Sequence, residues 1–371
     1  MGSKRSQLQN GLGLQLQKVL KPGDRFVDLF SGSGAVAMFA SQILPVHVTA
    51  VDLQMYAVAL SGAVVRRTVP LDPGKFGSKW TSRASELIER DASVALERRM
   101  LSEALDAEKV QALREIATQH SDVFVRSYGG HYFSIEQALA IGTLRANLPT
   151  KPTEAEAALA ALISSSSRSS ASPGHTAQPF QPTKNALPHI DAIWRRNLLK
   201  EVASSLDGIT SQHAQVEGRA VQADANEFAQ NLEGNEVVFL DPPYSAAQYS
   251  RFYHVLEAVA VGGYTDVFGA GRAPHISDRS RSEYSMVSTA RASLGRLLET
   301  LADRSCRVIA TFPQGRASNG MSGMDIVADA RQWFEVDSSV SRATFSTMGG
   351  NGSGRSARHQ AQEMIITMYP K

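Results

Sequence analysis

The sequence has almost no cysteine and no long apolar run. Cys306 is the one cysteine among 371 residues, which excludes a disulfide framework within the chain and a cysteine-rich zinc site. No apolar stretch is long enough to span a bilayer, and the chain does not start with a signal-peptide pattern. We therefore expect a protein of the reducing cytoplasm that does not bind a membrane.

The chain also lacks a strong excess of either charge. It has 38 Lys and Arg against 36 Asp and Glu, so nucleic-acid binding would require a local basic patch and not a global field. Hydrophobic residues make up 43% of the chain, which is enough for a sizeable core. His175, His254 and His359 are scattered without metal-ligand spacing, so no metal is expected.

Residues 1–66 predict the start of an α/β domain. Apolar residues at helical spacing in 7–20 end at Lys21-Pro22-Gly23, which breaks a helix. After this break, strand-like and helix-like segments alternate at 25–30, 31–43, 47–53 and 56–67. This β-α-β-α order is typical of a doubly wound parallel sheet.

Residues 67–216 differ from the segments on both sides of them. Charged amphipathic helices are expected at 85–105, 107–120, 152–163 and 190–206. A Ser/Pro-rich stretch, 164–188, is predicted to be flexible or ordered only on binding. Residues 217–371 return to an α/β pattern, with strands at 219–225, 236–241, 306–312 and 363–369. The simplest architecture is one α/β sheet domain interrupted after its second βα unit by a mainly helical insert.

Gly32 and Gly34 lie between the first predicted strand and the helix that follows it. Glycine there allows a ligand to approach the backbone, and the helix N-terminus offers unpaired N–H groups. Because the spacing is shorter than G-x-G-x-x-G, a pyrophosphate is not the natural ligand. Asp52, at the end of the next strand, could accept hydrogen bonds from a ribose diol. The alternative is a tight βα turn in which Asp52 only caps a helix.

The segment Asp241-Pro242-Pro243-Tyr244 follows the buried-strand pattern "VVFL". Proline removes an N–H donor and fixes φ, so the strand must stop there. Ligands of α/β sheets bind at the carboxyl ends of strands, which places Asp241 and Tyr244 beside the glycine loop. Asp241 and the carbonyl of Pro242 could accept both hydrogens of a planar amino group, and a base could stack on Tyr244. The alternative is a purely structural strand terminator.

Three segments in this order, "DLFSGSG", "AVDLQMYA" and "DPPYSAAQYSRFYHVLE", resemble adenine-specific DNA methyltransferases of the Dam type. The resemblance implies a class I methyltransferase fold (Rossmann-like, a doubly wound α/β sheet) with the target-recognition region in the helical insert. It also implies S-adenosyl-L-methionine as the methyl donor. "GSKR" and "VQADANEF" resemble further cofactor motifs of this family. The cofactor contacts implied in this way are Lys4, Asp28, Phe30, Gly32, Gly34, Asp52, Leu53 and Asp224.

The activity that the resemblance implies is methylation of the N6 amino group of a flipped adenine in double-stranded DNA. Asp241, Pro242, Pro243 and Tyr244 would be the catalytic residues. The implied setting is restriction-modification or phage defence, with a restriction or defence subunit as a partner. Three alternatives stay open: a cytosine N4 methyltransferase, an RNA adenine methyltransferase, and a catalytically silent DNA-binding subunit. Asp at position 241 favours adenine, and the large insert favours DNA.

Contacts with DNA are predicted from loop residues of suitable chemistry. Arg272, Arg279, Arg281 and Arg355 lie in loops rich in small residues and could contact phosphates. The alternative for each arginine is a solvated charged face. Gln178, in "GHTAQPFQPTKN", could make a bidentate contact to adenine and take part in base readout.

Overall fold

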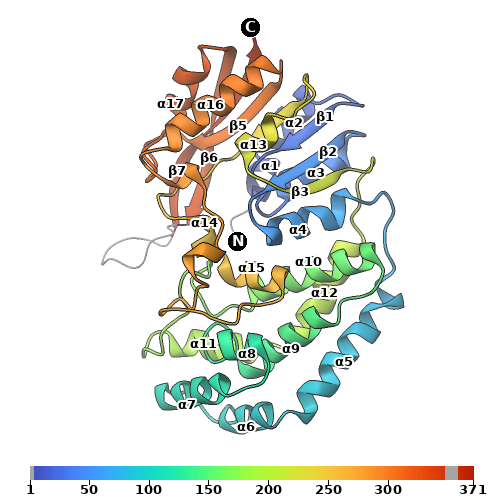
Figure 1. The fold of residues 1–371 in the computed structure, drawn as a ribbon, viewed down its shortest axis with the longest axis vertical. Coiled ribbons are helices and arrows are strands. Elements are labelled where there is room, and N and C mark those ends of the chain that lie inside the picture. Colours follow the sequence, from blue (N-terminus) through green and yellow to red (C-terminus); the bar gives the residue numbers. More distant parts are fainter. Residues whose placement is uncertain (1–3, 347–357) are drawn as a thin grey trace. The chain divides into compact units, whose positions relative to one another are not determined.

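The computed structural model describes residues 4–346 and 358–371, and the chain divides into two compact units (Figure 1). The sheet unit consists of Gly2–Val69, His213–Tyr249 and Ser280–Lys371, and the helical unit of Pro70–Gln212 and Ser250–Arg279. The helical unit therefore includes 250–279 in addition to most of the insert expected at 67–216. Within the described residues, no helix is long and apolar enough to cross a membrane.

The sheet has seven strands in the order β3-β2-β1-β4-β5-β7-β6. The strands β3, β2, β1, β4 and β5 are parallel, whereas β7 runs antiparallel to both β5 and β6. This arrangement confirms the expected doubly wound α/β fold. The strands are β1 (Arg25–Asp28), β2 (His47–Asp52), β3 (Arg219–Gln222), β4 (Val237–Leu240), β5 (Arg307–Pro313), β6 (Phe334–Ser346) and β7 (Arg358–Pro370).

Alternating strand residues build a separate core on each face of the sheet. Val237 and Phe239 of β4 pack on one face, and Val238 and Leu240 pack on the other. All four are buried because helices cover both faces, as is usual around parallel strands. The helices of this unit are α1 (Arg5–Gln9), α2 (Leu12–Val19), α3 (Ala35–Ile43), α4 (Met55–Val65), α13 (Ala225–Ala229), α16 (Ala290–Asp303) and α17 (Gly323–Ala330).

Polar caps divide the helical unit into shorter helices than the sequence predicts. Asp91 interrupts the helix expected at 85–105, because its carboxylate accepts the N–H groups of Ser93 and Val94 and so starts α6. Asn197 caps α12 in the same way inside the helix expected at 190–206. The helices are α5 (Gly77–Arg90), α6 (Ala92–Met100), α7 (Ala107–Thr118), α8 (Val123–Tyr128), α9 (Ile135–Ala146), α10 (Pro152–Arg168), α11 (Leu187–Trp194), α12 (Leu198–Thr210) and α15 (His254–Val261).

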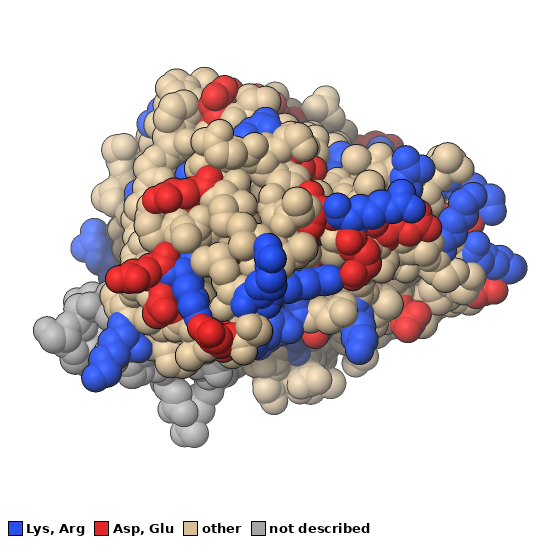
Figure 2. Space-filling model, turned by 90° about the horizontal axis from the view of Figure 1, so that it is seen from below, with Lys and Arg blue, Asp and Glu red and all other residues tan. Residues whose placement is uncertain are grey.

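The remaining short elements are α14 and three single 3₁₀ turns. The helix α14 (Tyr249–Phe252) follows the Asp241–Tyr244 motif along the chain. The 3₁₀ turns are η1 (Pro73–Lys75), η2 (Ile276–Asp278) and η3 (Glu283–Ser285). On the face drawn in Figure 2, basic and acidic side chains are interspersed, and neither sign covers a continuous field.

The segment 164–188, predicted to be flexible or ordered only on binding, makes defined contacts in the structure. Its first residues continue α10 to Arg168. Further along, the N–H of Thr176 donates to the carbonyl of Phe252 at 2.6 Å, and Thr176 is buried. The hydroxyl oxygen of the fully buried Tyr132 lies 2.6 Å from the carbonyl oxygen of Thr176 and 2.8 Å from that of Gly271, and its single hydrogen bonds to one of the two. These bonds within the helical unit fix a segment whose composition alone suggests disorder.

Two further elements of the sheet unit differ from the sequence prediction. The single helix expected at 7–20 is divided into α1 and α2 at Gly11, whose φ of 118° is incompatible with a helix. The strand β6 was not predicted, because it lies at the edge of the sheet and most of its exposed positions carry serines and charged side chains. It pairs with β7 and is the last strand on that side of the sheet.

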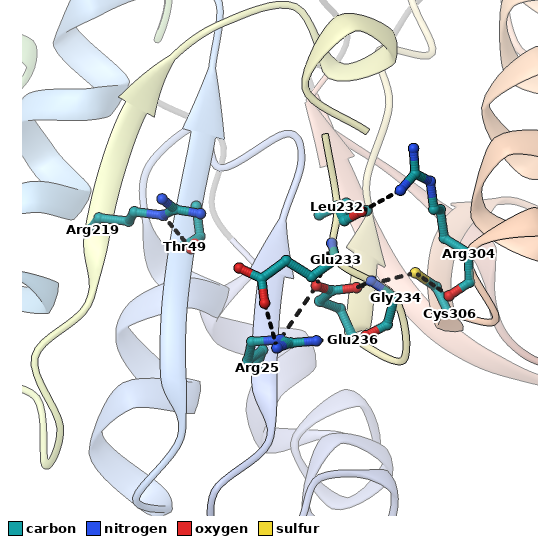
Figure 3. Close-up of polar contacts among 9 residues, drawn as sticks. All are labelled: Arg25, Thr49, Arg219, Leu232, Glu233, Gly234, Glu236, Arg304 and Cys306. Carbon is teal, nitrogen blue, oxygen red and sulfur yellow. Dashed lines mark hydrogen bonds and ion pairs between the residues drawn. The ribbon is translucent and has the colours of Figure 1, made fainter. Parts of the chain in front are cut away.

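At the amino end of the parallel strands, a buried carboxylate fixes the turn before β4 (Figure 3). Glu236 accepts the N–H groups of Glu233, at 3.0 Å, and Gly234, at 2.9 Å. Arg25, the first residue of β1, pairs with both Glu236 and Glu233. The thiol of Cys306 also contacts Glu236. Burial raises the pKa of this thiol to about 12, so Cys306 is an inert core residue.

Candidate functional site

The loop after β1 has the backbone geometry that its glycines predict. Gly32 has a φ of 50° and Gly34 a φ of 75°, which is the left-handed region. Gly34 is also the N-cap of α3, and a Cβ added there would lie 2.8 Å from Oγ of Ser61. Glycine is therefore required at position 34 by both its conformation and its surroundings.

Asp52 connects this loop to the end of β2. The N–H of Gly32 donates to Oδ2 of Asp52 at 2.9 Å, and the N–H of Gln54 donates to Oδ1 at 2.9 Å. Burial raises the pKa of Asp52 to about 6, against the effect of these two N–H donors and of the N–H of Leu53. Since each carboxylate oxygen has a second lone pair, Asp52 can hold the loop and still accept a hydrogen bond from a ligand.

Asp28, the last residue of β1, is a buried carboxyl group with 1% of its surface exposed. Burial raises its pKa to about 8, the N–H of Phe30 opposes this rise, and the negative charges of Asp241 and Asp52 add to it. The carboxyl group is therefore largely protonated at pH 7. In that state it can donate a hydrogen bond, which an ionised carboxylate cannot do.

Asp241 comes directly after β4, the strand next to β1. Its Oδ1 lies 2.9 Å from Nζ of Lys4 and accepts the hydroxyl of Thr311 at 3.0 Å. Both contacts converge on one oxygen. Within the described residues, Oδ2 has no donor, so it can accept a hydrogen bond from a ligand.

Asn319 and Phe312 contact Pro243 and Tyr244, the last two residues of the motif. The side-chain amide of Asn319 donates to the carbonyl of Pro243 at 2.8 Å, whereas the carbonyl of Pro242 has no donor among the residues that the structure describes. The ring of Tyr244 packs edge-on against Phe312, with 6.4 Å between ring centroids. Burial raises the pKa of Tyr244 to about 12, so its hydroxyl stays neutral.

Three further predicted cofactor residues, Phe30, Leu53 and Asp224, each make a different kind of contact. Phe30 packs edge-on against Tyr284 at 4.9 Å between ring centroids. Asp224 caps α13, because one of its carboxylate oxygens accepts two backbone N–H groups. The carbonyl of Leu53 accepts the side-chain amide of Gln222 at 3.0 Å. The sheet unit thus places all the predicted cofactor residues at or near the carboxyl ends of its parallel strands.

Sequence reasoning missed three residues of this site: Thr311, Asn319 and Glu363. Glu363 is the second partner of Lys4, with 2.5 Å between Oε1 and Nζ, and its side chain is 1% exposed. The only signal in the sequence is a charged residue at the start of the otherwise apolar strand "EMIITMY". Nothing local distinguishes Thr311 within "RVIATF" or Asn319 in its loop from ordinary structural residues.

The residues predicted to contact DNA differ in their surroundings. Gln178 and Arg281 are exposed, in the helical and the sheet unit respectively. The guanidinium of Arg272 donates to the carbonyls of Ser127 and Arg126 within the helical unit, so it also has a structural role. Arg279, in the same unit, is partly buried. Arg355 lies outside the described residues. Their contacts with phosphates remain predictions.

Comparison with known proteins gives a family match over most of the chain. The model of the D12 class N6 adenine-specific DNA methyltransferases matches residues 1–302. The type II methyltransferase M.NlaIII of Neisseria lactamica is 41% identical over 63 residues, which are 17% of this chain and 18% of that protein. The type II methyltransferase M.FokI of Planomicrobium okeanokoites is 34% identical over 58 residues, or 15% of this chain and 9% of that protein. The aligned part is therefore under a fifth of either relative.

Proposed function

Since the chain belongs to the D12 class N6 adenine-specific DNA methyltransferase family, we propose that it methylates the exocyclic amino group of adenine in DNA. One observation carries this proposal. Oδ2 of Asp241 and the carbonyl of Pro242 both lie at the carboxyl end of β4, and neither has a donor within the described residues. Two adjacent acceptors suit the two hydrogens of a planar amino group.

The amino group of adenine is a poor nucleophile because its lone pair is delocalised into the ring. Asp241 and Pro242 would each accept one of its hydrogens, which lets the nitrogen become pyramidal and directs its lone pair at the methyl group. Positive charge would develop on the nitrogen as the N–C bond forms and the bond between the methyl carbon and the sulfur of the donor breaks, and Oδ2 of Asp241 would stabilise this charge and take the proton. Most of the acceleration then comes from orientation and from preorganised electrostatics.

The family depends on S-adenosyl-L-methionine in general. This cofactor supplies an activated methyl group on a positively charged sulfur. The residues of the glycine loop fit such a ligand: Oγ of Ser31 is buried without a partner in the described part of the chain, and Asp52 keeps free lone pairs. We propose that the cofactor is held by Lys4, Asp28, Phe30, Gly32, Gly34, Asp52, Leu53 and Asp224.

The substrate that we propose is double-stranded DNA from which the target adenine is flipped, since an amino group inside a duplex cannot reach Asp241. Tyr244 offers a ring on which the flipped base can stack. The helical unit would supply target recognition, with Gln178 exposed in a loop that Tyr132 anchors. The names of the relatives as type II methyltransferases support a restriction-modification or defence setting, in which a restriction or defence subunit would be a partner.

The test is single-molecule sequencing of DNA from a methylation-free host that expresses the wild type, Asp241→Ala or the control Asp303→Ala. Asp303 is an exposed residue of α16 and lies outside the proposed site. We expect one methylated adenine motif with the wild type and the control, and none with Asp241→Ala. Methylation of cytosine would correct the target base. Unmodified DNA together with methylated RNA would move the activity to the RNA alternative. Cofactor binding without any methylation would favour a silent subunit.

A further inference from the structure

We propose that Glu363 is a positioning residue for methyl transfer: it holds Lys4 so that the ammonium occupies Oδ1 of Asp241 and Oδ2 stays available for the amino group. The inference rests on the proposed function. Glu363 lies outside residues 1–302, the part of the chain that the family model matches.

The direction of β7 brings Glu363 to the site. Its partner in the β5–β7 ladder is Pro313, the last residue of β5. Because β7 is antiparallel to β5, an early residue of β7 lies at the edge where the parallel strands end. Asp28 and Asp241 lie at the ends of β1 and β4 on this same edge. In a parallel β7, Glu363 would lie toward the opposite edge of the sheet.

The contacts of Glu363 indicate that it does more than fill the core. An isolated buried carboxylate is costly, and Glu363, with 1% of its side chain exposed, has Lys4 as its charged partner at 2.5 Å. Lys4 is itself only 15% exposed and reaches Asp241 at 2.9 Å. The ammonium therefore lies between two carboxylates, that of Glu363 in β7 and that of Asp241 directly after β4. Glu363 fixes one side of the ammonium, and this fixes where the ammonium can meet Asp241.

The charges around Lys4 give this arrangement a measurable pH dependence. Burial alone would lower the pKa of Lys4, but the carboxylates of Asp241 and Glu363 outweigh it and raise the pKa well above its usual value. Tyr244 also faces Lys4 and is neutral. When Glu363 is replaced by a neutral residue, only the carboxylate of Asp241 opposes the effect of burial on the pKa of Lys4. Lys4 then loses its proton at a lower pH. Asp241 would then lose its partner on Oδ1.

The experiment compares full-length wild type, Glu363→Gln and the control Glu335→Gln in methyl transfer to duplex DNA from pH 6 to 10. Glutamine keeps the volume of Glu363 without its charge, and Glu335 is an exposed glutamate at the far end of the β6–β7 pair. We expect Glu363→Gln to lower kcat by about 10²-fold with KM nearly unchanged. We also expect an alkaline limb set by Lys4 to appear below pH 10 in Glu363→Gln, whereas in the wild type this limb lies above the tested range. Glu363→Asp, which keeps the charge, should restore part of both.

A second readout does not depend on catalysis. Competitive acetylation of lysine amines, followed by mass spectrometry, reports the fraction of Lys4 that has lost its proton at each pH. Lys4 should react at lower pH in Glu363→Gln than in the wild type and in Glu335→Gln. Unchanged Lys4 reactivity, or an unchanged alkaline limb in a folded variant, would overturn the role of Glu363. If the wild type does not methylate DNA but Lys4 still reacts at a lower pH in Glu363→Gln, the result would contradict the proposed function alone.

Discussion

The backbone N–H of Gly32 donates to Oδ2 of Asp52 at 2.9 Å, so the loop after β1 is fixed to the end of β2. The second oxygen of Asp52 accepts the N–H of Gln54 at 2.9 Å, just before α4. A single carboxylate thus holds two loops at the carboxyl edge of the sheet. Its shape and charge should therefore control the affinity for the cofactor.

Asp52→Asn should weaken the binding of S-adenosyl-L-methionine. The amide has one acceptor oxygen instead of two, so one of the two backbone N–H groups would face an NH₂ group. Leaving a buried donor without an acceptor costs about 1–3 kcal/mol, and we expect affinity to fall by an amount in this range. Isothermal titration calorimetry measures the change, with Asp303→Asn as the control. An unchanged Kd would show that Asp52 only shapes the turn.

Tyr244→Ala should weaken the capture of the flipped base, whereas Tyr244→Phe should retain most of it. Stacking of a base on an aromatic ring contributes about 1–3 kcal/mol, and phenylalanine keeps the ring without the hydroxyl. DNA with 2-aminopurine at the target position becomes fluorescent when the base leaves the stack, so the signal reports capture directly. If alanine and phenylalanine gave equal signals, the ring of Tyr244 would have no part in holding the base.

Asp28→Asn should reduce the pH dependence of stability in the cofactor-free protein. The pKa of Asp28 is about 8 in the folded chain, so the folded state keeps a proton that the unfolded state releases from about pH 4 upward. The stability from this proton is complete below pH 4 and is lost as pH rises to 8, with a slope of up to about 1.4 kcal/mol per pH unit.

Chemical denaturation of the wild type and Asp28→Asn at pH 5, 6, 7 and 8 measures this slope. The free energy of unfolding of the wild type should fall more steeply with pH than that of the variant. Asp303→Asn, at an exposed position, should follow the wild type. Parallel curves for the wild type and Asp28→Asn would mean that Asp28 is ionised in the folded protein.

Gln178→Ala should change the methylated sequence and leave cofactor binding intact. A bidentate contact between glutamine and adenine contributes about 1–3 kcal/mol of discrimination, so its loss relaxes one position of the recognised motif. Single-molecule sequencing of host DNA measures the motif, and Gln111→Ala provides a matched control on the exposed side of α7. If the motif of Gln178→Ala equals that of the wild type, this glutamine does not take part in readout.

The sequence by itself determined the ends of the parallel strands and the residues placed there. Glycine at 32 and 34 and proline at 242 and 243 act on φ and on backbone hydrogen bonding within a few residues, so their effect can be recognised without knowing the fold. The continuous apolar run "VVFL", which is typical of a strand buried on both faces, was equally local. The break at Gly11 depended on a φ of 118° that the helical spacing of 7–20 does not reveal.

The tertiary structure alone decided which side chains surround Asp241. Lys4 precedes α1, Thr311 lies within β5, and Glu363 lies in β7, so their contacts join segments up to 359 residues apart. No local pattern encodes a pairing over such a distance. The direction of β7 was also absent from the apolar pattern of "EMIITMY", which would be the same in a parallel strand. Only the antiparallel ladder with β5 places Glu363 at the carboxyl edge, where a second negative charge can hold Lys4.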